Sequence, residues 1–128
     1  MACATAQFTT PEEDSAAKRF NVKNSKSNIY IYKNENLGLN TEISVDIDGK
    51  HAGNTLQKTF ILESVGPGEH TITAHAENTS KIELVTEAGK IYFVWLDVNL
   101  GAFVNRGQLR SVSEEKGKSG VMECMLVN

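Results

Sequence analysis

The middle of the chain alternates strictly between apolar and polar side chains. Within residues 41–48 the apolar residues Ile43, Val45 and Ile47 alternate with hydroxyl or acidic residues. The same alternation recurs over residues 71–76 and, through Ile82 and Leu84, over residues 81–87. A period of two residues is that of a half-buried β-strand. We therefore predict three strands, each with one face against a core.

Three further runs carry apolar side chains at consecutive positions. They lie within residues 28–33, 59–65 and 91–96, and the last contains the single Trp of the chain. In the first and last runs both faces are apolar, which is typical of strands in the interior of a sheet. We predict a strand for each run, and weaker strands over residues 97–104 and 108–112.

Turn-forming residues separate these predicted strands. The residues that we assign to structural turns are Asp48, Gly49, Gly66, Pro67, Gly68 and Gly89. Seven or eight short strands at this spacing predict a mainly β fold, an antiparallel β-sandwich. Strands do not alternate with long helices along the chain, which argues against a doubly wound α/β fold.

The N-terminal region carries the signals of a helix start. Thr10 can cap a helix, Pro11 suits its first position, and Glu13 completes a Thr-x-x-Glu capping box. Acidic residues come first and basic residues last, which suits the helix dipole. We predict a short helix over residues 11–20.

The C-terminal region is ambiguous. Ser113 resembles a helix start, but Gly117 and Gly120 each disfavour a helix by about 1 kcal/mol. We favour a short C-terminal helix. Gly117-Lys118-Ser119 is similar to the end of a phosphate-binding loop, yet the glycine required five positions earlier is Val112. For these three residues a flexible polar loop is the better interpretation.

Length and composition fit one globular domain. The chain has 128 residues, of which 40% are hydrophobic and 23% charged, and this excludes a disordered tail and a disulfide-dense miniprotein. We divide it into a tether with a short helix (residues 1–27) and a β-sandwich domain (residues 28–128). The net charge of −3 argues against nucleic acid as a partner, because nucleic-acid binders show a basic excess. No apolar run reaches 18 residues, and no signal peptide is recognised at the start.

Two cysteines lie near opposite ends of the chain. Cys3 stands between small residues and precedes a polar stretch, as in a bacterial lipoprotein whose signal has been removed. Two interpretations remain for it: a lipid attachment site, or a free thiol near the terminus. The apolar neighbours of Cys124 indicate a buried thiol that packs as a small hydrophobe. A disulfide between the two is compatible with the sequence, whereas no cysteine spacing indicates a zinc site.

The histidines and acids offer little coherent chemistry. His70 and His75 are five residues apart on one predicted strand, so they point to opposite faces, and His51 follows a turn. Asp46 and Asp48 are similar to part of a calcium loop, but the bidentate Glu is missing, and a turn is the better interpretation. We therefore predict no catalytic residues, no metal and no cofactor.

The aromatic residues allow two interpretations. Those of the two most apolar strands are Tyr30, Tyr32, Tyr92, Phe93 and Trp95. They can form a platform for a sugar or a nucleic acid, or they can form the core. Aromatic residues make up only 7% of the chain, so the core interpretation is favoured. Asn78-Thr79-Ser80 matches a glycosylation sequon and is interpreted as a turn.

One ordered set of segments is more specific. Val45-Asp46-Ile47-Asp48-Gly49-Lys50 is followed by Gly66-Pro67-Gly68-Glu69-His70 and then by Glu87-Ala88-Gly89-Lys90. This order, with the first strand Ile29-Tyr30-Ile31-Tyr32-Lys33 and the ending Glu123-Cys124-Met125-Leu126, resembles domain-of-unknown-function family 2846. These are small bacterial lipoproteins, similar in pattern to PEGA-type surface domains.

The resemblance implies a small β-sandwich held on a bacterial membrane by a lipidated Cys3. It brings no catalytic residues, and with no coherent site in the sequence we expect no enzyme activity. The resemblance also implies a place in the cell envelope, facing the periplasm or the cell surface. We expect a binding or scaffolding function, with the membrane as one partner through Cys3 and an envelope protein as another. The alternatives are a carbohydrate- or peptidoglycan-binding module, which requires an exposed Trp95 or Tyr, and a small hydrolase that uses the histidines.

Overall fold

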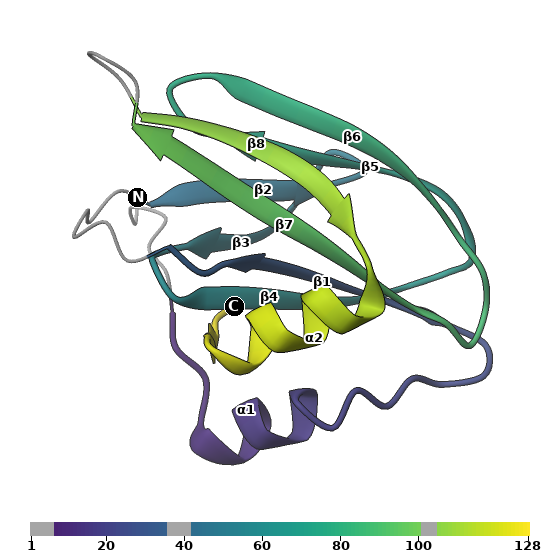
Figure 1. Ribbon diagram of the computed structural model, residues 1–128. Helices are drawn as coiled ribbons and strands as arrows, with labels where there is room; N and C mark the ends of the chain where they lie inside the picture. The colour runs from purple at the N-terminus through teal and green to yellow at the C-terminus, as the bar shows by residue number, and fades with distance from the viewer. Residues whose placement is uncertain (1–6, 36–41, 101–104) are drawn as a thin grey trace.

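The computed structural model describes residues 7–35, 42–100 and 105–128. In these residues the chain forms two β-sheets, and two helices lie beside one of them (Figure 1). The elements in chain order are α1 (Pro11–Ala17), β1 (Ser27–Lys33), β2 (Ile43–Ile47), β3 (Lys50–Thr55), β4 (Thr59–Val65), β5 (Gly68–His75), β6 (Thr79–Thr86), β7 (Ile91–Leu100), β8 (Asn105–Val112), α2 (Glu114–Met122) and β9 (Met125–Leu126).

The two sheets have five and four strands in the described residues. The five-stranded sheet has the order β8-β7-β1-β4-β9, and the four-stranded sheet has the order β3-β2-β5-β6. Neighbouring strands are antiparallel, except that β1 with β7 and β4 with β9 are parallel. The predicted fold class is confirmed, because the protein is mainly β with two packed sheets and a short helix towards each end.

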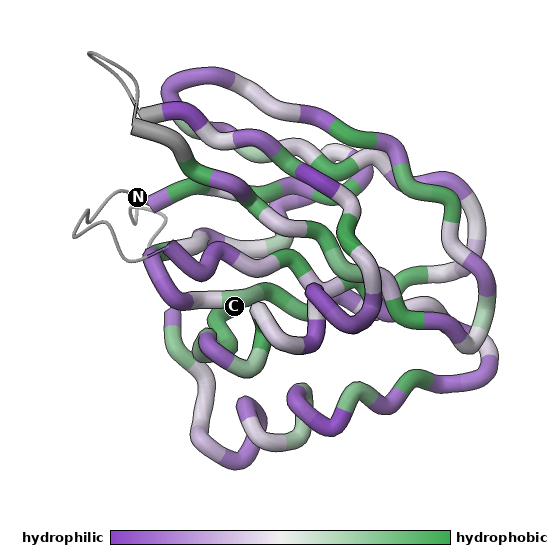
Figure 2. The backbone as a smooth tube through the Cα atoms, viewed as in Figure 1, coloured by the Kyte–Doolittle hydropathy of each residue, from purple (hydrophilic) through white to green (hydrophobic). Residues whose placement is uncertain are grey.

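Strand periodicity builds the core between the two sheets. The three apolar residues of β2, Ile43, Val45 and Ile47, meet Ile29 and Ile31 of β1 in one buried cluster. Figure 2 shows the alternation of apolar and polar positions along these strands. Burial of one such side chain contributes about 1.5–3 kcal/mol, so this aliphatic layer supplies a large share of the stability. We call it the inner core.

A second core lies on the other face of the five-stranded sheet, under the helices. It is aromatic: the Tyr30 ring stacks on Phe93 at 5.2 Å and on Phe60 at 6.0 Å between centroids. The Tyr30 hydroxyl donates a hydrogen bond to the carbonyl of Ala17 at 2.6 Å and so ties α1 to the sheet. Phe20, just beyond α1, packs on the same ring at 5.3 Å. We call this layer the outer core.

Two glycines allow α2 to lie directly on the outer core. A Cβ at Gly117 would come within 2.1 Å of Phe93, and one at Gly120 within 2.2 Å of the Tyr32 ring. The predicted C-terminal helix is therefore present, and the Ser113 side chain caps it by accepting from the Lys116 amide. The interpretation of residues 117–119 as a flexible polar loop is wrong. The glycines cost helix propensity, but the close packing that they permit outweighs this cost.

Two strands were not foreseen from the pattern. β3 has no apolar alternation, and pairing with β2 holds it in the sheet, with a register shift next to Val45. β9 has only two residues and pairs with β4. Residues 97–100, predicted as part of a separate strand, continue β7, and residues 101–104 lie outside the described residues. α1 is shorter than predicted and ends at Ala17.

The two ends of the described chain meet. Phe8 forms an antiparallel bridge with Val127, and the Thr9 amide donates to the carbonyl of Leu126 at 3.2 Å. The predicted capping box of α1 is present, with Thr10 and Glu13 each bonded to the other's backbone amide. Neither helix in the described residues is long and apolar enough to cross a membrane.

Candidate functional site

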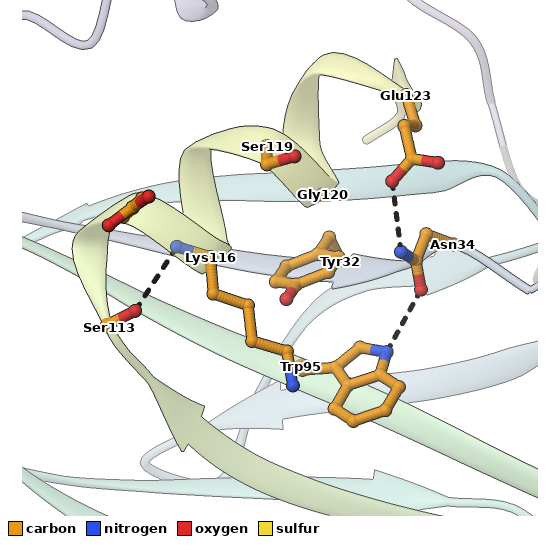
Figure 3. A pocket seen from close by; sticks show the side chains of 9 residues that line it. Tyr32, Asn34, Trp95, Ser113, Lys116, Ser119, Gly120 and Glu123 are labelled. Carbon is orange, nitrogen blue, oxygen red and sulfur yellow. Dashed lines mark hydrogen bonds between the residues drawn. The ribbon is translucent and has the colours of Figure 1, made fainter.

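A groove of about 430 Å³ opens between α2 and the five-stranded sheet (Figure 3). Aromatic, amide, hydroxyl and charged side chains line it together. The lining residues are Tyr32, Asn34, Trp95, Ser113, Glu115, Lys116, Ser119, Gly120 and Glu123. We call it the Trp95 groove.

The fold leaves Trp95 half-buried at this groove. Trp95 lies opposite Tyr32 in the parallel pairing of β7 with β1, on the face that α2 covers. Gly117 and Gly120 bring the helix down on Phe93 and Tyr32, and α2 does not close over Trp95. One large aromatic ring therefore remains at the edge of the outer core.

A chain of polar contacts holds Trp95 in place (Figure 3). The indole Nε1–H donates to Oδ1 of Asn34 at 3.0 Å, and Nδ2 of Asn34 donates to Oε2 of Glu123 at 3.2 Å. The other oxygen of Glu123 lies 3.7 Å from Nζ of Lys58. The indole is thus oriented through its nitrogen, which leaves its ring free to pack against another group.

The exposed Lys116 reaches over that ring. Its Nζ lies 4.4 Å from the ring centroid of Trp95, within the range of a cation–π contact. Such a contact at an exposed site contributes only about 0.5–1 kcal/mol, so a ligand can displace this side chain.

Burial sets the protonation of the groove floor. It raises the pKa of Tyr32 to about 12, and the neighbouring Cys124 and Glu123 side chains raise it further. The phenol therefore stays neutral at physiological pH. The groove combines a neutral aromatic surface with carboxylate, amide, hydroxyl and ammonium groups, which suits a small ligand with one apolar face and several hydroxyl groups.

The five predicted aromatic residues divide between the two interpretations. Tyr30, Tyr32 and Phe93 are buried in the outer core, as the core interpretation expects. Trp95 and Tyr92 are only half-buried. The Tyr92 hydroxyl accepts a hydrogen bond from the Glu87 amide at 2.8 Å. The core interpretation therefore holds for three of the five residues, and Trp95 has the exposure that a platform requires.

The three histidines contact two carboxylates. His51 and His75 contact Asp46, and His70 contacts Asp48. Nε2 of His75 lies 2.8 Å from Asp46, and Nδ1 of His51 lies 3.7 Å from the same carboxylate on the solvent face of the four-stranded sheet. Ser44 Oγ contacts this same Nδ1 at 3.1 Å, so His51 cannot relay a proton from Ser44 to Asp46 through its two nitrogens. Among the described residues no group of three or more His, Cys, Asp or Glu side chains is arranged to hold a metal ion.

The predicted turn residues lie in tight connections. Asp48 and Gly49 both have positive φ, 53° and 80°, as a two-residue hairpin turn of the primed type requires. Gly68 and Gly89 also have positive φ, of 131° and 80°, and the Gly66 carbonyl lies 2.6 Å from Nε2 of His70. Pro67 is exposed between Gly66 and Gly68.

Of the two cysteines, the structure describes Cys124. Cys3 lies outside the described residues. Cys124 is a buried free thiol in the outer core, whose Sγ donates to the carbonyl of Lys33 at 3.8 Å. Burial raises the pKa of Cys124 to about 12, and the charge of Glu123 adds to the effect. This thiol packs as an apolar side chain.

Several residues of interest were missed from the sequence. Asn34 and Glu123 orient Trp95. Asn34 is a single polar residue after β1 with no motif around it, and Glu123 was noted only as part of the family-like ending. Asn78 was interpreted only as a turn, but its side chain donates to the carbonyl of Gly107 at 2.8 Å and accepts from the Gly107 amide at 3.0 Å. These two bonds join β8 to the start of β6 and use the amide that a sequon would offer.

Comparisons with known proteins agree with the resemblance seen in the sequence. The model of a family described as "Protein of unknown function (DUF2846)" matches residues 23–107. An "Uncharacterized protein" of Haemophilus influenzae is 34% identical over 122 residues, which cover 94% of this chain and 73% of the relative. The matched region holds both sheets up to the start of β8. The chain therefore belongs to the DUF2846 family of proteins of unknown function.

Proposed function

We propose that this protein is a non-enzymatic binding domain of the bacterial envelope, anchored by lipid on Cys3, and that the Trp95 groove binds a glycan. The observation that carries the proposal is the half-buried Trp95, the single Trp of the chain, held by its nitrogen at the mouth of a polar groove.

The groove suits a sugar for a physical reason. The C–H face of a pyranose is apolar and packs on an aromatic ring, while its hydroxyls need partners in the plane around that ring. Trp95 offers the ring, and Asn34, Glu123 and Ser119 offer amide, carboxylate and hydroxyl partners around it. Lys116 protects the ring when no ligand is bound.

The envelope location rests on the N-terminal sequence and on the resemblance. Small residues flank Cys3, and Cys3 is five residues before Phe8, where the folded part is already tied to the C-terminal strand. A lipid on Cys3 would therefore hold the domain close to a membrane, with each buried methylene contributing about 0.8 kcal/mol. An envelope protein is the further partner that we propose.

The absence of catalysis is part of the proposal. In the stretches that the structure describes, the serine in contact with a histidine is on an open sheet face and shares one ring nitrogen with Asp46. The thiol of Cys124 is buried and neutral. Neither arrangement activates a nucleophile.

Intrinsic fluorescence tests the glycan site directly, because the chain has one Trp. We expect soluble peptidoglycan fragments or N-acetylglucosamine oligomers to change the emission of Trp95 in a saturable way. Asn34→Ala should weaken this binding by about fivefold to tenfold, because it removes one hydrogen bond to the ligand and the group that orients the indole. Tyr92→Phe, an aromatic change on the same strand but outside the groove, is the matched control. Unchanged emission, together with no retention on isolated sacculi, would contradict the glycan assignment.

Mass spectrometry of the native protein, extracted from membranes, tests the anchor. We expect the mass of a diacylated or triacylated Cys3 and loss of membrane association in Cys3→Ser. An unmodified Cys3 in the soluble fraction would overturn the anchor and leave the glycan assignment to be judged on its own test.

A further inference from the structure

A second cleft, of about 410 Å³, lies at the opposite end of β1 from the Trp95 groove. Lys26, just before β1, lines the cleft, whereas Asn34, just after β1, lines the groove. The β2–β3 turn, β4 and the start of β5 form its other walls. We call it the turn cleft. Two segments that carry the family resemblance, around Asp48 and around His70, meet there.

His70 joins these two segments. Its Nδ1 lies 2.6 Å from Oδ2 of Asp48, and its Nε2 lies 2.6 Å from the carbonyl oxygen of Gly66. A carbonyl and an ionised carboxylate only accept hydrogen bonds, so this geometry suits a ring that carries a proton on both nitrogens. The other oxygen of Asp48 accepts from the Thr71 amide at 2.8 Å. The charge of Asp48 is thus neutralised within the fold.

Burial alone lowers the pKa of His70, but it is outweighed by the hydrogen bonds to Asp48 and Gly66 and by the Asp48 charge, which together raise that pKa above its ordinary value. The same hydrogen bond, first among the causes, lowers the pKa of Asp48. Both directions support the ion pair that the distances indicate.

The charge left over in the turn cleft is positive. Lys26 and Lys50 are exposed, line the cleft, and take part in none of the ion pairs found among the described residues. The remaining carboxyl, Glu63 on β4, is half-buried, and burial raises its pKa and so disfavours its charged form. This positive cleft stands out on a chain of net charge −3.

The walls are not purely polar. Ile47, Ala52 and Val65 line the cleft between the charged groups, beside the inner core. An anion with a short apolar portion would find both an apolar wall and two ammonium groups there.

From this arrangement we infer that the turn cleft binds a small oxyanion, a carboxylate or a phosphate, between Lys26 and Lys50, with His70 pairing with the carboxylate of Asp48 at the wall of the cleft. The site is separate from the glycan groove and does not depend on it. Affinity falls as the pH rises, because loss of the His70 proton frees the Asp48 charge to repel the anion.

Nitrogen-15 NMR titration of the folded chain tests the site with inorganic phosphate and with propionate, each against chloride at equal ionic strength. We expect saturable shifts of the amides of Lys50, His51 and Gly66. Propionate, which is fully ionised at both pH values, should bind more weakly at pH 8 than at pH 6. The probe that binds more tightly identifies the chemical source of the oxyanion, and binding of either supports the site.

Charge-removing variants make the test specific. Lys26→Gln and Lys50→Gln should each weaken binding about tenfold, because each removes one charge-assisted contact to the anion. Lys81→Gln, an exposed lysine on β6 away from the cleft, is the matched control and should change nothing. All three positions are exposed, so folding is preserved. Shifts that do not saturate, or equal weakening by Lys81→Gln, would overturn the proposal and reveal general ionic screening only.

Discussion

The two faces of the five-stranded sheet are covered in different ways. The inner face packs on a second sheet through aliphatic side chains, so alternation along the strands is enough to build it. The outer face packs on helices through aromatic rings, and it depends on the close approach of α2 at Gly117 and Gly120. The inner core therefore follows from the two-residue periodicity of the strands, whereas the outer core depends on the close fit of α2 on the aromatic rings.

The two cores also differ in what they can contribute: the inner core contributes to stability only, whereas the outer core also supplies a side chain to a groove. The inner core is continuous, and none of its members is a ring with a polar handle. The outer core contains Tyr30, Tyr32 and Trp95, each of which presents a polar atom at one end. Where the helix cover stops, one of these residues becomes the edge of a groove. A helix lid on a sheet thus leaves an opening that a second sheet would have closed.

Breaking the inner core should have the largest effect. Ile31→Ala removes a fully buried side chain between the sheets, and we expect a loss of about 3–4 kcal/mol in the free energy of unfolding. Chemical denaturation measures it. The exposed Val85→Ala is the control and should change stability by less than about 0.5 kcal/mol.

Breaking the fit of the outer core should cost somewhat less. Gly117→Ala favours a helix by about 1 kcal/mol, yet its methyl group would collide with Phe93. We expect a net loss of about 2–3 kcal/mol, since neither helix nor sheet can move freely. Ser119→Ala, an exposed position on the same helix, should be neutral or slightly stabilising. A stabilised Gly117→Ala protein would show that α2 does not pack as described.

A smaller effect is expected at the link between α1 and the outer core. Tyr30→Phe keeps the stacked ring but removes the hydrogen bond to Ala17, and it leaves a carbonyl without this partner. We expect a loss of about 1–1.5 kcal/mol, with faster amide exchange in α1 than in α2. Equal exchange in both helices would indicate that the bond does not hold α1.

The smallest expected effect is a difference between the two cores in how the free energy of unfolding depends on pH. The pKa of His70, beside the inner core, is raised on folding, so its contribution is complete below its unfolded pKa near 6.5 and is lost as the pH rises through the folded value. The pKa of Asp48 is lowered, so its contribution is complete above about 3.8 and is lost in more acidic solution.

The outer core should not respond in that range. Tyr30, Tyr32 and Cys124 have their pKa values raised to about 12 by burial, so stability falls only where the unfolded chain ionises, above about pH 9. The stability difference between pH 5 and pH 8 should therefore be larger in the natural chain than in His70→Gln, where only smaller contributions such as that of Glu63 remain. A pH effect of the same size in the variant would assign it to another group.

The sequence predicts the inner core well and the outer core only in part. Alternating Ile and Val residues indicate which face is buried, whatever the partner is. The meaning of Gly117 and Gly120 depends on what lies opposite them, and propensity alone counts them as helix breakers. β3 was missed for a similar reason, since its neighbours, and not its own side chains, hold it in the sheet.

The sequence likewise predicts the candidate sites only in part. Trp95 was recognised as a candidate because it is unique, but Asn34 and Glu123 carry no signal until the fold brings them together. The turn around Asp48 and the turn around His70 were both recognised, yet sequence spacing could not show that one ring bonds to both of them.

Residues 114–127 complete both the helix cover and the edge of the larger sheet. β9 and the partner of Phe8 lie within residues 125–127, and α2 precedes them directly. A chain that emerges with its N-terminus first therefore has only α1 and Phe20 to cover the aromatic face of its larger sheet until α2 is made. The central pairing of β1 with β7 already spans about sixty residues, and contacts at such separation form slowly. Most of the long-range contacts that stabilise the domain are therefore expected to form in one late step, which can be followed as a single transition in refolding experiments.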